Sequence, residues 1–81
     1  MIPGVAEAHY VRDYTIHLRF TDQTEGDVDL RDELYGEIFE PLKDPAFFQK
    51  FFVHPEFHTL TWPNGADVAP EFLYAKVRLP A

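Results

Sequence analysis

Apolar and polar residues alternate most regularly between Thr15 and Phe20. Ile16, Leu18 and Phe20 occupy every second position, and the residues between them are polar. Successive side chains of a strand point to opposite faces, so this pattern predicts a strand with one buried and one solvated face. Such strands are typical of antiparallel sheets.

The two flanking segments predict further strands of the same sheet. Residues 5–11 are rich in β-forming side chains. Residues 25–30 alternate again, with Val28 and Leu30 expected to face the core. Short polar segments at 12–14 and 21–24 are typical of turns. Together the three segments predict an N-terminal three-stranded meander.

The periodicity becomes helical after residue 33. Leu34, Ile38 and Leu42 recur at four-residue spacing, which is helical periodicity and predicts one or two short turns of helix. Gly36 and Pro41 interrupt the pattern and limit the length of any helix there.

Two prolines mark the expected starts of short helices. Asp44 can cap a helix from Pro45 to about residue 50, because proline fits the first helical position. Pro70 opens a last helix, in which Phe72 and Leu73 are expected to seal the core.

Between these helices, residues 51–54 and 59–62 predict a hairpin around residues 55–58. Leu60 and Trp62 share one face, with threonines on the other. Trp62 must be extended because proline follows it, and Asn64-Gly65 accepts the positive φ angles that reverse a chain.

The expected fold class is α+β, with a small antiparallel sheet, made of the N-terminal three-stranded meander and the later hairpin, packed with two or three short helices. A length of 81 residues favours one domain, 1–81. With 46% hydrophobic and 16% aromatic residues, the chain can form a core, which argues against disorder.

The net charge of the chain limits the classes of macromolecule that it is expected to bind. The chain has 14 acidic and 7 basic residues, a net charge of −7, and its basic residues are scattered singly. Nucleic-acid phosphates repel such a surface, so direct nucleic-acid binding is not expected. The acidic residues gather in the middle of the chain, and the candidates there for binding a basic protein partner are Glu25, Asp27, Asp29, Asp32 and Glu33. The alternative is a solvated face with no partner.

Candidate chemistry is sparse. The absence of cysteine excludes disulfides and thiolate metal sites and suits a reducing cytoplasm. No phosphate loop or nucleophile elbow occurs, so we expect no catalytic residue and no cofactor. His54, Glu56 and His58 are zinc-ligand types, but their predicted turn argues for exposed side chains without a metal. The sequence has no signal-peptide pattern and no apolar run approaching the roughly 20 residues of a membrane span.

Two further histidines lie on predicted neighbouring strands. His9 and His17 could approach each other, and such a pair could titrate near neutral pH. Two separate surface histidines are the simpler interpretation.

Three stretches, residues 13–22, 39–48 and 59–67, resemble the bacterial domain-of-unknown-function family 2442. The most specific part is the signature Trp62-Pro63-Asn64-Gly65-Ala66-Asp67. The resemblance implies a compact α+β domain without an established activity. Members are often encoded beside another small protein, in the manner of a toxin–antitoxin pair, which implies an antitoxin or adaptor role.

This sequence differs from some members of the family in two features. Some relatives carry an appended helix-turn-helix segment, whereas this sequence ends at Ala81, so we do not expect operator binding. Ala69 precedes Pro70, where an Asp or a similar capping residue is common in relatives.

The signature stretch has two interpretations. Asp67 is expected to accept backbone N–H groups and so hold the turn, which makes the signature structural. The alternative is a small-ligand-binding or enzymatic domain centred on Trp62, Asn64 and Asp67. Edge strands of so small a sheet could also pair between two copies, so a homodimer is a further hypothesis.

Overall fold

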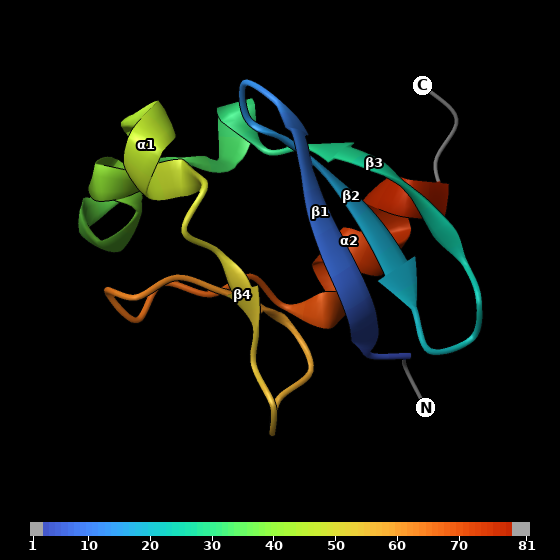
Figure 1. Ribbon diagram of the computed structural model, residues 1–81. Coiled ribbons are helices and arrows are strands. Elements are labelled where there is room, and N and C mark those ends of the chain that lie inside the picture. The colour runs from blue at the N-terminus through green and yellow to red at the C-terminus, as the bar shows by residue number, and fades with distance from the viewer. Residues whose placement is uncertain (1–2, 79–81) are drawn as a thin grey trace.

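The computed structural model describes residues 3–78. Its first half is an antiparallel sheet in the order β1-β2-β3 (Figure 1). The strands are β1 (Val5–Arg12), β2 (Thr15–Phe20) and β3 (Glu25–Asp29). His9 lies opposite His17, and His17 lies opposite Asp27. The predicted meander is confirmed.

The second half consists of short elements. In chain order they are the 3-10 helices η1 (Arg31–Glu33) and η2 (Glu37–Lys43), the helix α1 (Pro45–Phe48), the strands β4 (Phe52–Val53) and β5 (Leu60–Thr61), and the helix α2 (Pro70–Arg78). Strands β4 and β5 form the predicted hairpin. The fold is therefore α+β. In the described part of the chain, no helix is long and apolar enough to cross a membrane.

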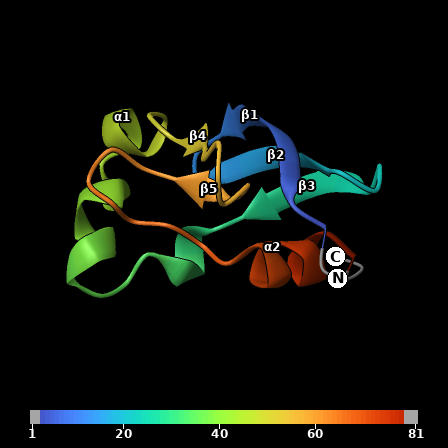
Figure 2. The same ribbon diagram turned by 90° about the horizontal axis from the view of Figure 1, so that it is seen from below.

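Helix α2 covers one face of the three-stranded sheet (Figure 2). The ring of Tyr74 packs edge-on against Phe20, with centroids 5.0 Å apart. A Cβ atom at Gly26 would lie 3.1 Å from Cγ1 of Val77, so the glycine lets α2 approach β3 closely. The alternate residues Ile16, Leu18 and Phe20 are fully buried beneath this layer, as the pattern predicted.

Trp62 links the hairpin to α1. Its side chain is 1% exposed, and its Nε1–H donates a 2.8 Å hydrogen bond to the carbonyl oxygen of Phe48. The ring centroids of Trp62 and Phe48 lie 5.7 Å apart, and Tyr14 packs edge-on against Phe48 with centroids 5.2 Å apart. One aromatic cluster therefore joins the β1–β2 turn, α1 and the hairpin.

Two apolar side chains of the helical segments are exposed, and one of them, Phe72, was expected to seal the core. Ile38 is 47% exposed, because η2 is a 3-10 helix with three residues per turn. In that geometry Phe39 and Leu42 share the inward face. Phe72 is 39% exposed, because Leu73 and Val77, four residues apart, form the face of α2 that meets the sheet.

The threonine face of the hairpin is buried as well as the face of Leu60 and Trp62. Thr59 and Thr61 are 4% and 9% exposed. The chain after the Asn64-Gly65 turn runs back along β5, where Val68 N–H donates to Leu60 O and Trp62 N–H donates to Ala66 O. The hydroxyl of Thr59 donates to the carbonyl of Val68 and is thereby satisfied.

Candidate functional site

The three acidic residues of β3 form a row on the sheet face opposite α2. Glu25, Asp27 and Asp29 are all exposed and alternate along the strand. Their Cα partners on β2 are Arg19, His17 and Thr15, the polar positions of that strand. We call these three carboxylates the β3 acidic row.

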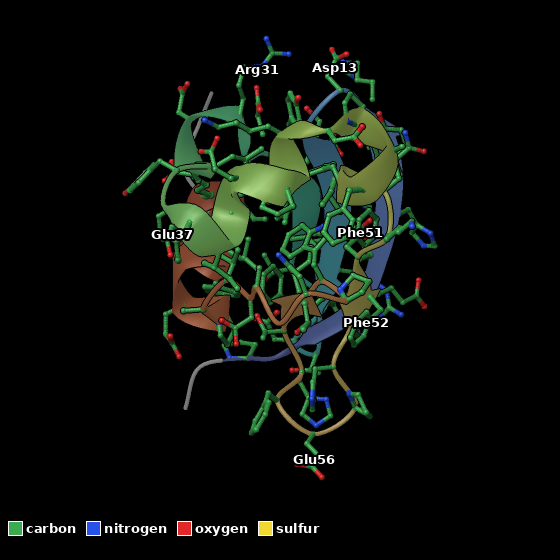
Figure 3. All side chains as sticks on the ribbon, turned by 90° about the vertical axis from the view of Figure 1, so that its left-hand side faces the viewer. Asp13, Arg31, Glu37, Phe51, Phe52 and Glu56 are labelled. Atoms are coloured by element: carbon green, nitrogen blue, oxygen red, sulfur yellow. The ribbon has the colours of Figure 1, made fainter. Side chains whose placement is uncertain are left out.

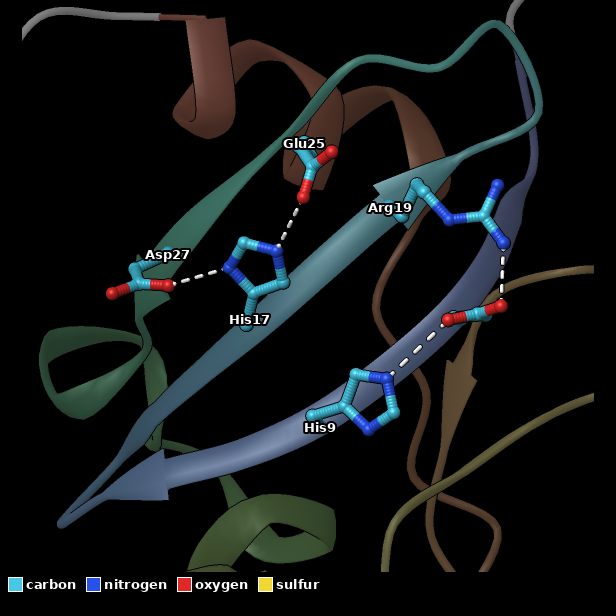
Figure 4. Close-up of polar contacts among 6 residues, drawn as sticks. His9, His17, Arg19, Glu25 and Asp27 are labelled. Atoms are coloured by element: carbon cyan, nitrogen blue, oxygen red, sulfur yellow. Dashed lines mark hydrogen bonds and ion pairs between the residues drawn. The ribbon is translucent and has the colours of Figure 1, made fainter.

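His17 lies between two members of the β3 acidic row (Figure 4). Its Nδ1 is 2.8 Å from Oδ1 of Asp27, and its Nε2 is 2.9 Å from Oε1 of Glu25. The hydrogen bond to Asp27, followed by the one to Glu25, raises the pKa of His17 above its ordinary value. His17, which lies outside the acidic run in the sequence, therefore contacts two of its carboxylates.

A second set of contacts continues across the same face to β1. Nη2 of Arg19 is 2.5 Å from one carboxylate oxygen of Glu7, and Nε2 of His9 is 3.3 Å from the other. The hydrogen bond from Arg19 lowers the pKa of Glu7. His9 and His17 are therefore neighbours, as expected, but each contacts carboxylates of its own.

The other two candidate acidic residues, Asp32 and Glu33, lie outside the β3 acidic row. Asp32 is exposed on η1, whereas Glu33 turns toward α2, with Oε1 3.4 Å from Nζ of Lys76. Asp29 also has a local role, because its Oδ1 accepts a 2.9 Å hydrogen bond from the backbone N–H of Arg31. The five predicted residues are thus divided between two surfaces.

Glu33 lies at an open hollow of about 330 Å3 beside the start of α2. Its lining is mostly apolar and consists of Glu33, Tyr35, Phe39, Asp67, Val68, Ala69 and Phe72. We call it the η2–α2 groove. It brings together Glu33 from the acidic run and Asp67 from the signature, which are 34 positions apart in the sequence. No local sequence pattern links these two carboxylates.

The side chain that holds the signature turn is Asn64. Its Oδ1 accepts a hydrogen bond from Ala66 N–H at 3.1 Å, and its Nδ2 donates to the carbonyl of Ile38 at 2.9 Å. Gly65 has the expected positive φ, 91°. Within residues 3–78 the carboxylate of Asp67 accepts no such hydrogen bond, so the expectation that Asp67 holds the turn is wrong. Pro63 is exposed beside it.

Replacing Asn64 by alanine is therefore expected to destabilise the fold more than replacing Asp67. Asn64→Ala removes two hydrogen bonds, which corresponds to about 1–2 kcal/mol and a fall in Tm of roughly 5–15 °C. Asp67→Ala should stay within about 0.5 kcal/mol, as is usual for an exposed side chain. Thermal melts followed by circular dichroism measure both, and the reverse order would contradict this assignment.

Stability should depend on pH through His17. A raised pKa means that the contacts to Asp27 and Glu25 stabilise the folded state fully below the ordinary pKa of 6.5. That contribution is lost as pH rises through the raised value. His17→Gln should therefore lower Tm by about 1–4 °C at pH 6 and by less at pH 9.

His9→Gln is the matched control for this prediction, because it removes a histidine from the same sheet face without touching the contacts of His17. Thermal melts from pH 5.5 to 9 compare the two variants with the original chain. Parallel pH profiles for His17→Gln and the original chain would show that the contacts of His17 do not contribute.

The loop between β4 and β5 is organised by one histidine. Nδ1 of His54 accepts hydrogen bonds from the backbone N–H groups of Glu56 and Phe57, at 3.1 and 3.2 Å. Glu56 projects at the tip of this loop (Figure 3). Across the described ranges of the chain, no group of three His, Asp or Glu side chains is arranged to hold a metal ion.

A second hollow, of about 480 Å3, lies where this loop approaches the sheet. Its lining residues are Pro3, Gly4, Thr21, Asp22, Phe57, His58 and Pro70. Its one carboxylate, Asp22, accepts a 2.6 Å hydrogen bond from the hydroxyl of Tyr74, which lowers the pKa of Asp22. This carboxylate is therefore already engaged, unlike that of Asp67.

Comparison with known protein families gives a match over most of the chain. The model of a family described as "Protein of unknown function (DUF2442)" matches residues 5–78. No curated protein and no solved structure matches the chain.

Proposed function

We propose that this chain, which belongs to the DUF2442 family of proteins of unknown function, is a non-enzymatic protein-interaction module. Its role would be that of the antitoxin or adaptor of a toxin–antitoxin-type pair in the bacterial cytoplasm. The observation that carries the proposal is the β3 acidic row, three exposed carboxylates at alternate positions of one strand. A basic protein is the partner that such a row fits.

The row lies on an edge strand. Within residues 3–78, β2 is the only strand that pairs with β3. Backbone bonds from Phe20 N–H to Thr24 O and from Leu30 N–H to Tyr14 O bracket the β2–β3 ladder. Because hydrogen-bonded positions alternate, the even-numbered residues of β3 bond to β2, and the backbone groups of Glu25, Asp27 and Asp29 point to the open edge. The same three residues therefore present both their carboxylates and their unpaired backbone N–H and C=O groups to a partner.

Charge favours a different protein over a second copy at this edge. Antiparallel pairing of β3 with itself would place two acidic rows side by side, and like charges on adjacent strands destabilise a sheet. Lys and Arg side chains on a partner would instead pair with the row and accelerate association. A homodimer through another surface stays a hypothesis.

The alternative of a small-ligand-binding or enzymatic centre on Trp62, Asn64 and Asp67 receives less support. The ring of Trp62 is buried, and both polar atoms of the Asn64 amide are engaged by the backbone. Asp67 lines the η2–α2 groove, whereas Trp62 and Asn64 line neither of the two hollows described above.

The first test is co-expression with the product of the adjacent gene. The neighbour should slow growth when expressed alone, and this chain should restore growth and co-purify with it. A neighbour that is harmless alone and is not retained would contradict the antitoxin role.

The second test locates the surface with the isolated pair. The triple variant Glu25→Gln, Asp27→Asn, Asp29→Asn should weaken binding at least tenfold, mainly through a slower association rate that depends less on salt. The control Asp13→Asn, Glu40→Gln, Glu56→Gln removes the same charge from exposed sites elsewhere. Equal affinities of the two triple variants would show that the partner does not bind the β3 acidic row.

A further inference from the structure

The η2–α2 groove exposes aromatic surface that the fold does not use for its core. Tyr35 is 70% exposed and Phe72 is 39% exposed, while Phe39 and Val68 are half-buried and pack against the core below. Exposed aromatic side chains over a packed base are typical of the energetic centre of a protein interface. The groove therefore has the composition of a docking site.

The charges around the groove are unequally paired. Glu33 has Lys76 3.4 Å away, and Nζ of that lysine lies 5.4 Å from the centroid of the Phe72 ring. Asp67, in contrast, has no cationic group within 4 Å among residues 3–78 and accepts no hydrogen bond there. A ligand that places one positive charge beside Asp67 would complete the pairing.

We propose that the η2–α2 groove accepts an aliphatic or aromatic side chain of a basic protein partner, next to a lysine or arginine that pairs with Asp67. The inference rests on the proposed function, since it takes the partner to be the same basic protein. A volume of about 330 Å3 is at the lower end of ligand sites, which are roughly 300–1,000 Å3, so it suits one or two side chains of a peptide segment.

A second copy of this chain fits the groove less well. The chain carries a net charge of −7, so most segments that it could offer would bring further negative charge toward Asp67 and Glu33. A segment of a basic protein brings the missing cation. Charge complementarity therefore favours a basic protein over a second copy of this chain in the η2–α2 groove.

The experiment begins with phage-displayed random 12-residue peptides, selected on the immobilised full chain. The enriched peptides should share one large apolar residue with a lysine or arginine within four positions. No enrichment, or enrichment of apolar peptides without a basic residue, would overturn the proposal.

A synthetic peptide of the enriched sequence is then titrated against variants by calorimetry. Phe72→Ala should raise Kd at least tenfold, and Tyr35→Ala provides a second groove variant of an even more exposed residue. Asp67→Asn should raise Kd about fivefold and reduce its salt dependence. Phe57→Ala is the matched control, because Phe57 is 65% exposed but lies in the β4–β5 loop, away from the groove.

The β3 triple variant separates this inference from the proposed function. It should leave the Kd of the short peptide unchanged, because the groove residues are intact. Peptide binding that persists although the adjacent gene product is neither toxic nor retained would support the groove and contradict the antitoxin role. Unchanged peptide binding by Phe72→Ala and Asp67→Asn, or a dimer in gel filtration that Phe72→Ala dissociates, would overturn the inference.

Discussion

Replacing Trp62 by alanine is expected to lower Tm by roughly 15–30 °C. The side chain is buried among aromatic rings, and large-to-small replacements of this kind cost about 3–5 kcal/mol. A domain of this size has a total stability of only about 4–12 kcal/mol, so the variant would be partly or wholly unfolded at 37 °C. Circular dichroism melts measure the shift.

The variant Trp62→Phe separates the indole hydrogen bond from the packing. It keeps an aromatic ring but leaves the Phe48 carbonyl without the donor that Nε1–H provides. An unsatisfied buried carbonyl costs about 1–3 kcal/mol, so Tm should fall by an intermediate amount. A fall of less than about 5 °C for Trp62→Ala would show that this ring does not anchor the cluster.

Replacing Leu73 by alanine should cost far more stability than replacing Phe72, although Phe72 is the larger side chain. Leu73 is fully buried between α2 and the sheet, and its truncation corresponds to about 2–5 kcal/mol, or a fall in Tm of roughly 10–25 °C. Phe72→Ala removes a side chain that is 39% exposed at the groove, and we expect a cost below about 1 kcal/mol.

Urea unfolding of both α2 variants provides the measurement, with the midpoint compared at equal m-values. The pair is its own control, because both substitutions introduce alanine into the same helix. A larger loss for Phe72→Ala than for Leu73→Ala would mean that α2 is rotated relative to the arrangement described above.

Local sequence patterns predicted the elements whose determinants are local. The strand at Thr15–Phe20 is confirmed with the same bounds and the same buried face. The cap of α1 is confirmed as well, since Oδ1 of Asp44 accepts a hydrogen bond from Ala46 N–H at 3.1 Å and Pro45 occupies the first helical position. Alternation and capping each depend on a few neighbouring residues, so they can be predicted from the sequence.

The helical region was less predictable, because a four-residue repeat does not reveal which helix type forms. Leu34 and Leu42 are buried, but the 3-10 geometry of η2 rotates Ile38 outward. In α2, the side of the helix that packs against the sheet carries Leu73, so Leu73 is buried and its neighbour Phe72 is exposed. Of the two outward-facing apolar side chains, Phe72 lines the η2–α2 groove.

The two candidate surfaces were predicted to different degrees. Alternation along residues 25–29 was sufficient to place Glu25, Asp27 and Asp29 on one face. The partnership of His17 with Asp27 and Glu25 needed the β2–β3 register, which depends on how the turn at 21–24 closes. An alternating sequence does not by itself fix which residue lies opposite which.

The sequence by itself determined the α+β class, the three-stranded meander, the Asn64-Gly65 reversal and the acidic character of β3, because composition, side-chain period and turn preference are properties of short segments. Only the tertiary structure decided that Asn64, and not Asp67, holds the signature turn, and that Glu33 and Asp67 lie at one groove. Those relations join residues far apart in the chain. They depend on how η1, η2 and α2 pack around the core, which no short pattern encodes.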